Sequence, residues 1–435
     1  MRTFKYIFML LVVGCSTVFA QQTPADPQTG IITIAGATAH IGNGEVIENS
    51  IIIIEDGKIT ACADARTSRI ALQGTIIQAE GKHVYPGIIA PYTTLGLQEI
   101  GAVRATNDTR EIGQMNPHIR SLIAYNAESK VVESMRPNGV LIGQITPRGG
   151  RITGTSSIVQ FDAWNWEDAA IKVDDGIHMN WPSSYTRGRW WLGEDPGLKV
   201  NKNYDKQVSQ VEDFIAESKA YLSGSKSTTN LQYEAMSGLF DGSKKLFISV
   251  NDEKGIRDAL SFYKKNGIQS MVIVGGYHAI KVADELKANN VPVLAQRVHR
   301  TPNSDDDDYD YPYKMAQLLS EAGVLVGLQN SGGMERANAR NLPFQAGTVA
   351  AHGMDKEKAL TLITSNTAKI LGIDDRLGTL EEGKDATLFI SEGDALDMRT
   401  NILTHAFING RAISLESHQT TLWKRYDKKI NGGQD

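Results

Sequence analysis

Between Gly87 and Gly372 the sequence alternates short apolar runs with stretches of helical periodicity. The apolar runs predict strands at 140–145, 246–250, 271–274, 291–295 and 324–328. The intervening stretches predict helices at 207–222, 255–266, 278–289, 313–322, 343–352 and 356–371. Near-continuous apolar strands separated by helices predict a parallel sheet that is covered on both faces. Over this length of chain, the expected closure of such a sheet is a (β/α)₈ barrel.

The two ends of the chain have a different pattern. Residues 31–85 are rich in Ile, Val and Thr, with Asp56-Gly57 as a hairpin turn. After Gly372 the chain returns to short β segments at 387–391, 406–409 and 412–415. We therefore expect a small β-sandwich domain built from 21–85 and 375–435, beside a barrel domain at 86–374.

One segment of the barrel region, about 150–206, departs from the alternating rhythm. It holds five of the six tryptophans together with many Gly, Asp and Pro residues. We interpret it as an insertion on the loop side of the barrel. Its tryptophans are expected either to form an aromatic wall over the barrel mouth or to form a small core of their own.

The N-terminus resembles a secretory signal peptide. Basic residues precede an apolar run that is too short to span a bilayer, and Ala20 ends a small-residue cleavage motif. Residues 1–20 are therefore predicted to be a signal peptide, and the protein to be exported and periplasmic. An alternative is a lipobox ending at Cys15, which would make the protein a lipoprotein. No other segment approaches membrane-spanning length. Cys62 is expected to be a small buried apolar residue.

Charge excludes one class of partner. The net charge is −5, and no run of Lys and Arg interrupts the sequence. We therefore expect no nucleic acid as a ligand.

The stretch from Met354 to Leu388 closely resembles the end of imidazolonepropionase-like amidohydrolases. In that family a last barrel helix ends Ala-Lys-x-Leu-Gly and leads into Gly-x-Leu-x-x-Gly-Lys-Asp-Ala. Residues 56–59, Asp-Gly-Lys-Ile, and the pair Pro86-Gly87 extend the resemblance over almost the whole mature chain. It implies a barrel with a β-sandwich, and hydrolysis of a carbon–nitrogen bond in a cyclic amide or a dipeptide-like substrate.

The same resemblance implies a metal site that this sequence does not reproduce. The family's ligands are two histidines on the first barrel strand, a Lys or Glu on the fourth, histidines on the fifth and sixth, and an Asp on the eighth. The corresponding positions on the first, fifth and eighth strands carry Tyr92, Thr94, Asn251 and Asn330. The sixth strand offers Gly275 and Gly276, and no fourth-strand lysine is identified. Neutral oxygen donors neither hold Zn²⁺ nor activate its water, so we expect no metal and no other cofactor.

Three other side chains are candidates for catalysis or binding. His278 follows a strand end, where it would be a surviving base, a lone metal ligand or a hydrogen-bonded residue at a helix start. Arg297 and His299, with Arg300, would either bind a substrate carboxylate or pair with the acidic run Asp305–Asp308. That run would bind Ca²⁺ or be a solvated loop.

Three hypotheses follow. The first is an exported family member without the metal site, a pseudoenzyme that binds a small-molecule ligand or a partner at the barrel mouth. The second is an active cyclic-amide or dipeptide hydrolase with a rearranged Zn²⁺ site on His278, His299 and the acidic loop. The third is a subunit that pairs with a ligand-complete amidohydrolase paralogue. A homo-oligomer is compatible with all three.

Overall fold

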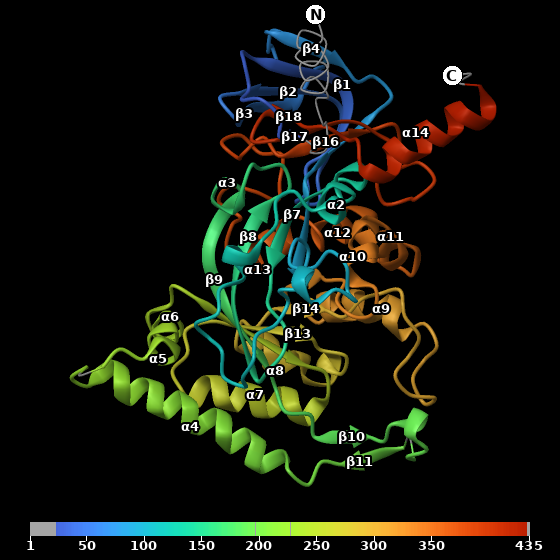
Figure 1. The fold of residues 1–435 in the computed structure, drawn as a ribbon. Helices are drawn as coiled ribbons and strands as arrows, with labels where there is room; N and C mark the ends of the chain where they lie inside the picture. The colour runs from blue at the N-terminus through green and yellow to red at the C-terminus, as the bar shows by residue number, and fades with distance from the viewer. Residues whose placement is uncertain (1–22, 196, 227, 433–435) are drawn as a thin grey trace, which may run out of the picture.

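The computed structural model describes residues 23–432 except 196 and 227. The predicted signal peptide, its cleavage after Ala20 and the alternative lipid anchor at Cys15 lie outside the described residues. Two large sheets stand one above the other in Figure 1, with helices packed around the lower one.

The first sheet combines both ends of the chain. Its strands run in the order β18-β17-β16-β5-β1-β2-β3, and β4 pairs with β1. Their bounds are β1 Ile32–His40, β2 Val46–Glu55, β3 Lys58–Asp64, β4 Thr75–Gln78, β5 His83–Pro86, β16 Leu388–Ser391, β17 Leu403–Ile408 and β18 Arg411–Ala412. Positive φ angles at Asp56 and Gly57 close the β2–β3 hairpin as predicted. The two ends meet where β5 pairs antiparallel with β16.

A small core lies within this sheet domain, formed by residues such as Ile34, Ile52, Leu388 and Phe407. Cys62 packs against it but is half-buried rather than buried. Burial, followed by the charge of Glu381, raises the pKa of the Cys62 thiol to about 11. The thiol therefore stays protonated at neutral pH.

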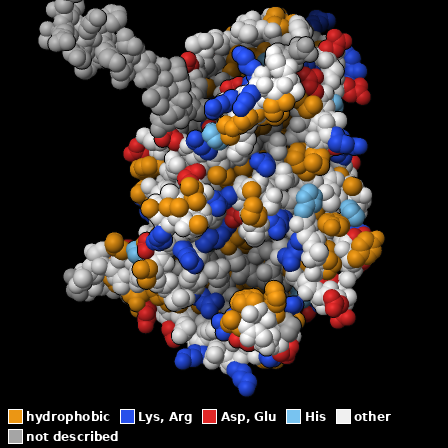
Figure 2. Space-filling view, turned by 45° about the vertical axis from the view of Figure 1, so that its right-hand side comes forward, with side chains coloured by type: hydrophobic (Ala, Val, Ile, Leu, Met, Phe, Trp, Pro, Cys, Tyr) orange, Lys and Arg blue, Asp and Glu red, His pale blue; other side chains and the backbone are white. Residues whose placement is uncertain are grey.

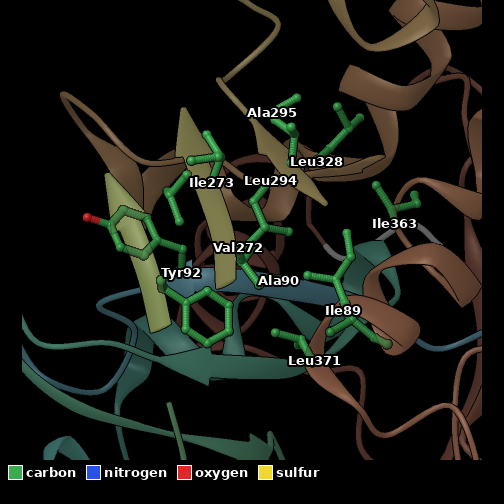
Figure 3. Packing of buried hydrophobic residues seen from close by; sticks show 14 of the residues in the cluster. Ile89, Ala90, Tyr92, Val272, Ile273, Leu294, Ala295, Leu328, Ile363 and Leu371 are labelled. Atoms are coloured by element: carbon green, nitrogen blue, oxygen red, sulfur yellow. The ribbon is translucent and has the colours of Figure 1, made fainter. Parts of the chain in front are cut away.

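The second sheet forms the barrel, in the order β6-β7-β8-β9-β12-β13-β14-β15. Its strands are β6 Ile88–Thr93, β7 Val140–Ile145, β8 Ile152–Gln160, β9 Ala170–Asn180, β12 Lys245–Val250, β13 Met271–Gly275, β14 Val293–Ala295 and β15 Val326–Leu328. Buried apolar side chains of these strands, among them Ile89, Val272, Leu294 and Leu328, pack into one hydrophobic cluster (Figure 3). The predicted TIM-like barrel beside a separate β domain is confirmed; the strands of that domain, expected as a small β-sandwich, are connected in one sheet.

A segment outside the strands completes the ring between β15 and β6. The backbone N–H of Leu328 donates to Leu362 O at 2.9 Å, and that of Ile89 donates to Ile363 O at 3.0 Å. These two carbonyls are used by the barrel rather than by a helix. As a result the single helix predicted at 356–371 is broken into α12 Lys356–Thr361 and α13 Ser365–Leu371.

The prediction of an insertion at about 150–206 is wrong for most of its length. Strands β8 and β9 belong to the barrel sheet, and β8 runs antiparallel to both β7 and β9. Every residue of β8 is buried. The sequence did not indicate a core strand here because five of its nine residues are Ser, Thr or Gly; Ser156 bonds Asp175 in the barrel interior, and Thr155 bonds the backbone oxygen of Pro117.

The tryptophans of this segment form neither a common wall nor a common core. Trp181 is buried and its ring lies 5.3 Å from that of Phe262, centroid to centroid. Trp164, Trp190 and Trp191 are exposed. The last two belong to a hairpin whose strands, β10 Tyr185–Arg187 and β11 Leu198–Val200, pair only with each other among the described strands. This hairpin projects from the lower right of Figure 1.

The remaining helices mostly cover the barrel. They are α2 Lys130–Glu133, α3 Trp166–Ala169, α4 Tyr204–Ser223, α5 Leu231–Ala235, α6 Ser237–Asp241, α7 Glu253–Lys265, α8 Ala283–Ala288, α9 Tyr311–Glu321, α10 Glu335–Asn338, α11 Leu342–Ala351 and α14 His418–Asn431. Short 3₁₀ turns are η1 Arg104–Thr106, η2 Ser121–Ala124, η3 Arg136–Asn138, η4 Trp190–Leu192, η5 Ala279–Val282 and η6 Ala339–Asn341. Gly372 ends α13 in the left-handed conformation, as expected. Within the described residues, none of the helices has the length and hydropathy needed to cross a membrane.

Candidate functional site at the barrel mouth

Tyr92 stands at the end of β6, the strand on which the family resemblance places the first metal ligands. Its backbone has a positive φ of 50°, and the pairing of β6 with β7 is irregular between Ala90 and Thr93. The ring stacks on His178 with 5.5 Å between centroids, and the hydroxyl lies 2.9 Å from Ser249 Oγ. Its backbone N–H donates to Gln144 Oε1 at 3.1 Å. The side chain is therefore fixed across the barrel interior (Figure 3).

Arg148, three residues after β7, covers Tyr92. Its guanidinium carbon lies 3.7 Å from the centre of the Tyr92 ring, a cation–π contact. One guanidinium nitrogen, Nη2, donates to Tyr92 O at 2.8 Å and to Glu335 Oε2 at 3.2 Å. The other terminal nitrogen, Nη1, is buried and has no hydrogen-bond acceptor in the described part of the chain. A permanent positive charge with one unsatisfied donor is thus held at the mouth.

Glu335 ties Arg148 to the end of β6. Its Oε1 accepts hydrogen bonds from Thr93 Oγ1 at 2.8 Å and from the backbone N–H of Thr94 at 2.7 Å. Asn330 supports the same element, because its side-chain amide donates to Glu335 O at 3.1 Å and accepts from Gln345 at 2.6 Å. Three of the four predicted degenerate positions, Tyr92, Thr94 and Asn330, therefore contact one Arg148–Glu335 ion pair.

Beneath Tyr92 lies a buried polar network. Ser156 Oγ donates to Asp175 Oδ1 at 2.7 Å, and Gln144 Nε2 donates to Asp175 Oδ2 at 2.7 Å. His178 Nε2 lies 2.8 Å from the same Ser156 hydroxyl. Because Ser156 gives its only proton to Asp175, Nε2 is the donor in this contact. His178 is therefore not placed to activate Ser156 as a nucleophile.

Burial sets the charge states in this network. It raises the pKa of Asp175, against the hydrogen bonds from Ser156 and Gln144, which lower it. Burial, followed by the charge of Arg148, holds the pKa of His178 well below its usual range. His178 is consequently neutral at pH 7.

The mouth pocket is the hollow above these residues, about 610 Å³ in volume. It is lined by Thr94, Gln98, Thr109, Val131, Ser134, Arg148, Gly332, Met334, Glu335, Arg336, Ala337, Arg340 and Gln419. Three arginines against one glutamate give the lining a net positive charge. Figure 2 shows Lys and Arg side chains gathered around the middle of the face that this view brings forward. A volume of this size suits a small-molecule ligand.

The fourth degenerate position, Asn251, lies in a separate hollow. Its backbone oxygen accepts from the N–H of His278 at 2.9 Å, and both residues line a groove of about 730 Å³ that also contains Tyr277 and Asp307. The four positions read from the sequence therefore do not meet at one point.

The three other candidates are also separated. Burial, followed by the charge of Lys281, lowers the pKa of His278 in its groove. His299 Nε2 lies 2.7 Å from Thr348 Oγ1 and borders a different hollow beside α11. Arg297 donates to Gly333 O at 2.8 Å, next to the mouth pocket. Neither Arg297 nor Arg300 pairs with the acidic run; Arg300 donates to Thr301 O at 3.1 Å and to the side chain of Asn303.

The side chains at the mouth do not suit a zinc ion. Tyr92 and Thr94 are committed to Ser249 and Glu335, and the Arg148 charge would repel a divalent cation held beside them. Strand β9, the fourth around the barrel, ends at Asn180 and has its lysine, Lys172, near its beginning. In the described ranges, no three His, Cys, Asp or Glu side chains are grouped so as to hold a metal.

Sequence reasoning missed the three residues that define this site. Arg148 directly precedes a glycine-rich stretch that begins at Gly149, and Glu335 follows a glycine-rich strand end at 330–333, but neither residue was itself a candidate; His178 lay in the supposed insertion. A signal for Arg148 did exist: it comes just after a predicted strand, where the side chains of a barrel mouth are expected.

Comparison with known proteins agrees with the fold. A model of the amidohydrolase family matches residues 313–413. Imidazolonepropionase of Thermoplasma volcanium is 22% identical over 382 residues, which cover 84% of this chain and 90% of the relative. The imidazolonepropionase of Caldanaerobacter subterraneus subsp. tengcongensis is 23% identical and covers 81% of this chain and 86% of the relative.

Solved structures point the same way. An amidohydrolase from Thermotoga maritima MSB8 superposes with a TM-score of 0.75 at 21% identity, over 88% of this chain and 99% of that one. Molinate hydrolase superposes with a TM-score of 0.52 at 15% identity, over 91% of this chain and 96% of that one. At these identities the likeness concerns the fold.

Proposed function

The chain belongs to the amidohydrolase superfamily as an imidazolonepropionase-like member, and from that premise we propose that its barrel mouth binds a small anionic molecule without a resident metal ion. The family and its curated relatives are hydrolases of carbon–nitrogen bonds. In this member Tyr92 and Thr94 stand at the first-strand positions, and an arginine–glutamate pair contacts both of them.

The single observation that carries the proposal is the placement of Arg148. Its guanidinium lies 3.7 Å above Tyr92 and bonds to Glu335, which in turn accepts from the N–H of Thr94. The pair therefore occupies the space between the first-strand positions. A fixed cation supplies one charge that a metal would otherwise supply, but it cannot lower the pKa of a bound water by coordination.

An anionic ligand follows from the charges around the pocket. The charged residues that line the pocket are three arginines, Arg148, Arg336 and Arg340, and one glutamate, Glu335. A carboxylate matches the planar fork of a guanidinium and accepts two hydrogen bonds from it. Glu335 and Tyr92 hold the guanidinium in place, so the ligand need not order it on binding.

The alternative, an active hydrolase with a rearranged zinc site, is less well supported. It needs His278, His299 and the acidic loop to act together. His299 instead lies against Thr348 beside α11, whereas His278 and Asp307 line the other groove. His178 does not supply a general base at the mouth either, because it is buried and its strongly lowered pKa makes it a weak base.

The test combines metal analysis with binding. The purified protein should contain far less than one zinc per chain, and calorimetry should detect binding of a carboxylate-bearing cyclic amide or N-acyl amino acid. Replacing Arg148 by Met should weaken that binding about 10- to 100-fold, because a charge-assisted hydrogen bond is lost. The matched control is Arg66→Met, a surface arginine of the sheet domain that pairs with Asp64.

Two results would contradict the proposal. One is a stoichiometric zinc ion that survives purification and whose removal abolishes hydrolysis of such a ligand. The other is unchanged affinity in Arg148→Met.

A further inference from the structure

A second feature of the molecule has no role in the barrel mouth. We define the arm as residues 184–200, excluding 196; it contains β10, η4 and β11. Every residue of its two strands is exposed, and neither strand pairs with another strand in the part of the chain that the structure describes. A two-stranded ribbon alone in water is marginally stable. The arm therefore needs a surface to pack against.

The side chains of the arm are those of an interface. Six large apolar residues are exposed, from 48% at Tyr185 to 73% at Val200, and the others are Trp190, Trp191, Leu192 and Leu198. Summed over the whole arm, they present on the order of 700 Å² of largely apolar surface. Tryptophans of this kind are the commonest hot spots of protein interfaces.

The arm has two distinct apolar parts. Tyr185 lies opposite Val200, and Arg187 opposite Leu198, so these four side chains share one face of the ribbon. Three of them, Tyr185, Arg187 and Leu198, form one wall of the 730 Å³ groove, whose other wall includes Tyr277 and Pro302. The second apolar part is the tip, Trp190 to Leu192, where the two indole rings stand edge to face at 6.2 Å. The ribbon face thus lines a hollow, whereas the tip projects from the arm.

The charge of the arm is low enough for two copies of it to associate. Its described residues include three basic and two acidic side chains, and two of the basic ones are paired: Arg189 with Glu194 at 3.0 Å and Lys199 with Asp195 at 3.5 Å. The remaining net charge of about +1 causes little repulsion. The C-terminal helix α14, also exposed, differs because four basic residues lie between Lys424 and Lys429 against one Asp427. Two copies of α14 would repel.

We propose that two copies of this chain form a two-fold dimer by reciprocal docking of their arms. The tip of each arm, Trp190 to Leu192, enters the groove between the arm and the barrel of the other copy. A two-fold interface requires one surface that carries both complementary parts, and the arm with its groove does so. The apolar arm surface and the groove it would cover approach the roughly 800 Å² per partner of a stable complex.

The docking has a consequence for the groove. Trp190 of the partner subunit would pack against the wall that contains Tyr277 and His278. The groove would then be an interface in the assembled protein, and the mouth pocket would be the site left open to a ligand.

The test measures mass in solution. Light scattering and sedimentation should give a two-chain particle for the purified protein at micromolar concentration. The double substitution Trp190→Asp with Trp191→Asp should raise the dissociation constant at least 100-fold, so that one chain is seen. The control is Trp164→Asp with Trp423→Asp, two tryptophans of matched exposure, 64% and 65%, outside the arm; this variant should remain a dimer.

A complementation experiment separates docking from loss of folding. The groove variant Leu198→Asp should also be monomeric, whereas its mixture with the tip variant should form some dimer, because one of the two reciprocal contacts is intact in the mixed pair. The proposal is overturned by a monomeric wild-type protein, by a dimer that the tip substitution leaves unchanged, or by a tip-dependent complex with a different chain. A monomer that co-sediments with vesicles of phosphatidylcholine and phosphatidylglycerol through its tip would identify the arm as a membrane contact instead.

Discussion

At the scale of single residues, the barrel mouth is organised by burial of polar groups rather than by metal ligands. His178 stacks between Tyr92 and Phe247 and donates through Nε2 to Ser156. Asp175 accepts a hydrogen bond from the Ser156 hydroxyl at the other end of this network. Because each of these groups has lost its water, its preferred charge state differs from that of the unfolded chain.

Stability should therefore depend on pH through His178. The pKa of His178 in the folded protein lies well below 6.5. Below about pH 6.5 its side chain is therefore protonated in the unfolded chain but still neutral in the folded protein. The free energy of unfolding should fall by up to about 1.4 kcal/mol per pH unit below that value. His178→Gln should be less stable at pH 8 because it loses the ring stacking, yet its stability should fall less steeply on acidification. Urea titrations at several pH values measure both slopes; parallel slopes would contradict the prediction.

At the scale of elements, strands with apolar sequence were predicted well and elements with polar interiors were not. The strand predicted at 140–145 is β7, and that at 246–250 is most of β12. Strand β8 was not predicted because it contains polar side chains. One of them, Ser156, contacts Asp175 and His178, and these residues come together only when the barrel closes. The break between α12 and α13 was not predicted for the same reason. The carbonyl oxygens of Leu362 and Ile363 accept hydrogen bonds from strands that are distant in sequence.

One element gives a direct test of local stabilisation. Asp252 caps α7 by accepting from Gly255 N at 2.9 Å, and it also accepts from Ser184 Oγ at 2.6 Å at the base of the arm. Asp252→Ala should lower the free energy of unfolding by about 1–2 kcal/mol. Asp252→Asn keeps an acceptor and should cost less. Equal losses in the two variants, measured by thermal unfolding, would show that the cap hydrogen bond is not the cause.

At the scale of the whole molecule, the sheet domain and the barrel are joined by buried charge. Asp162 follows β8 and is only 1% exposed; Arg411 of β18 donates to its Oδ2 at 2.9 Å, and Arg136 lies 3.3 Å from its Oδ1. The N–H of Ala25 also donates to Asp162 at 2.9 Å. One carboxylate thus links both chain ends to the barrel.

Removing this carboxylate should destabilise the whole protein. Asp162→Ala leaves two largely buried arginines without its charge, and we expect a loss of about 3–5 kcal/mol in the free energy of unfolding. The matched control is Asp64→Ala, which removes a surface partner of Arg66 and should cost much less, because solvent screens that pair. Chemical denaturation compares the two variants. A loss at Asp162 no larger than that at Asp64 would contradict a linking role.

The sequence by itself determined the class of fold and the family. Hydrophobic periodicity, the Asp56-Gly57 turn and the helix ending at Gly372 are local signals, because each depends on residues within a few positions of one another. The tertiary structure alone decided what stands at the mouth. Arg148 and Glu335 are 187 positions apart and meet only when the barrel closes, and the same closure places β8 in its wall. No local pattern carries that information, because the energy of an ion pair depends on distance in space and on burial, not on separation along the chain.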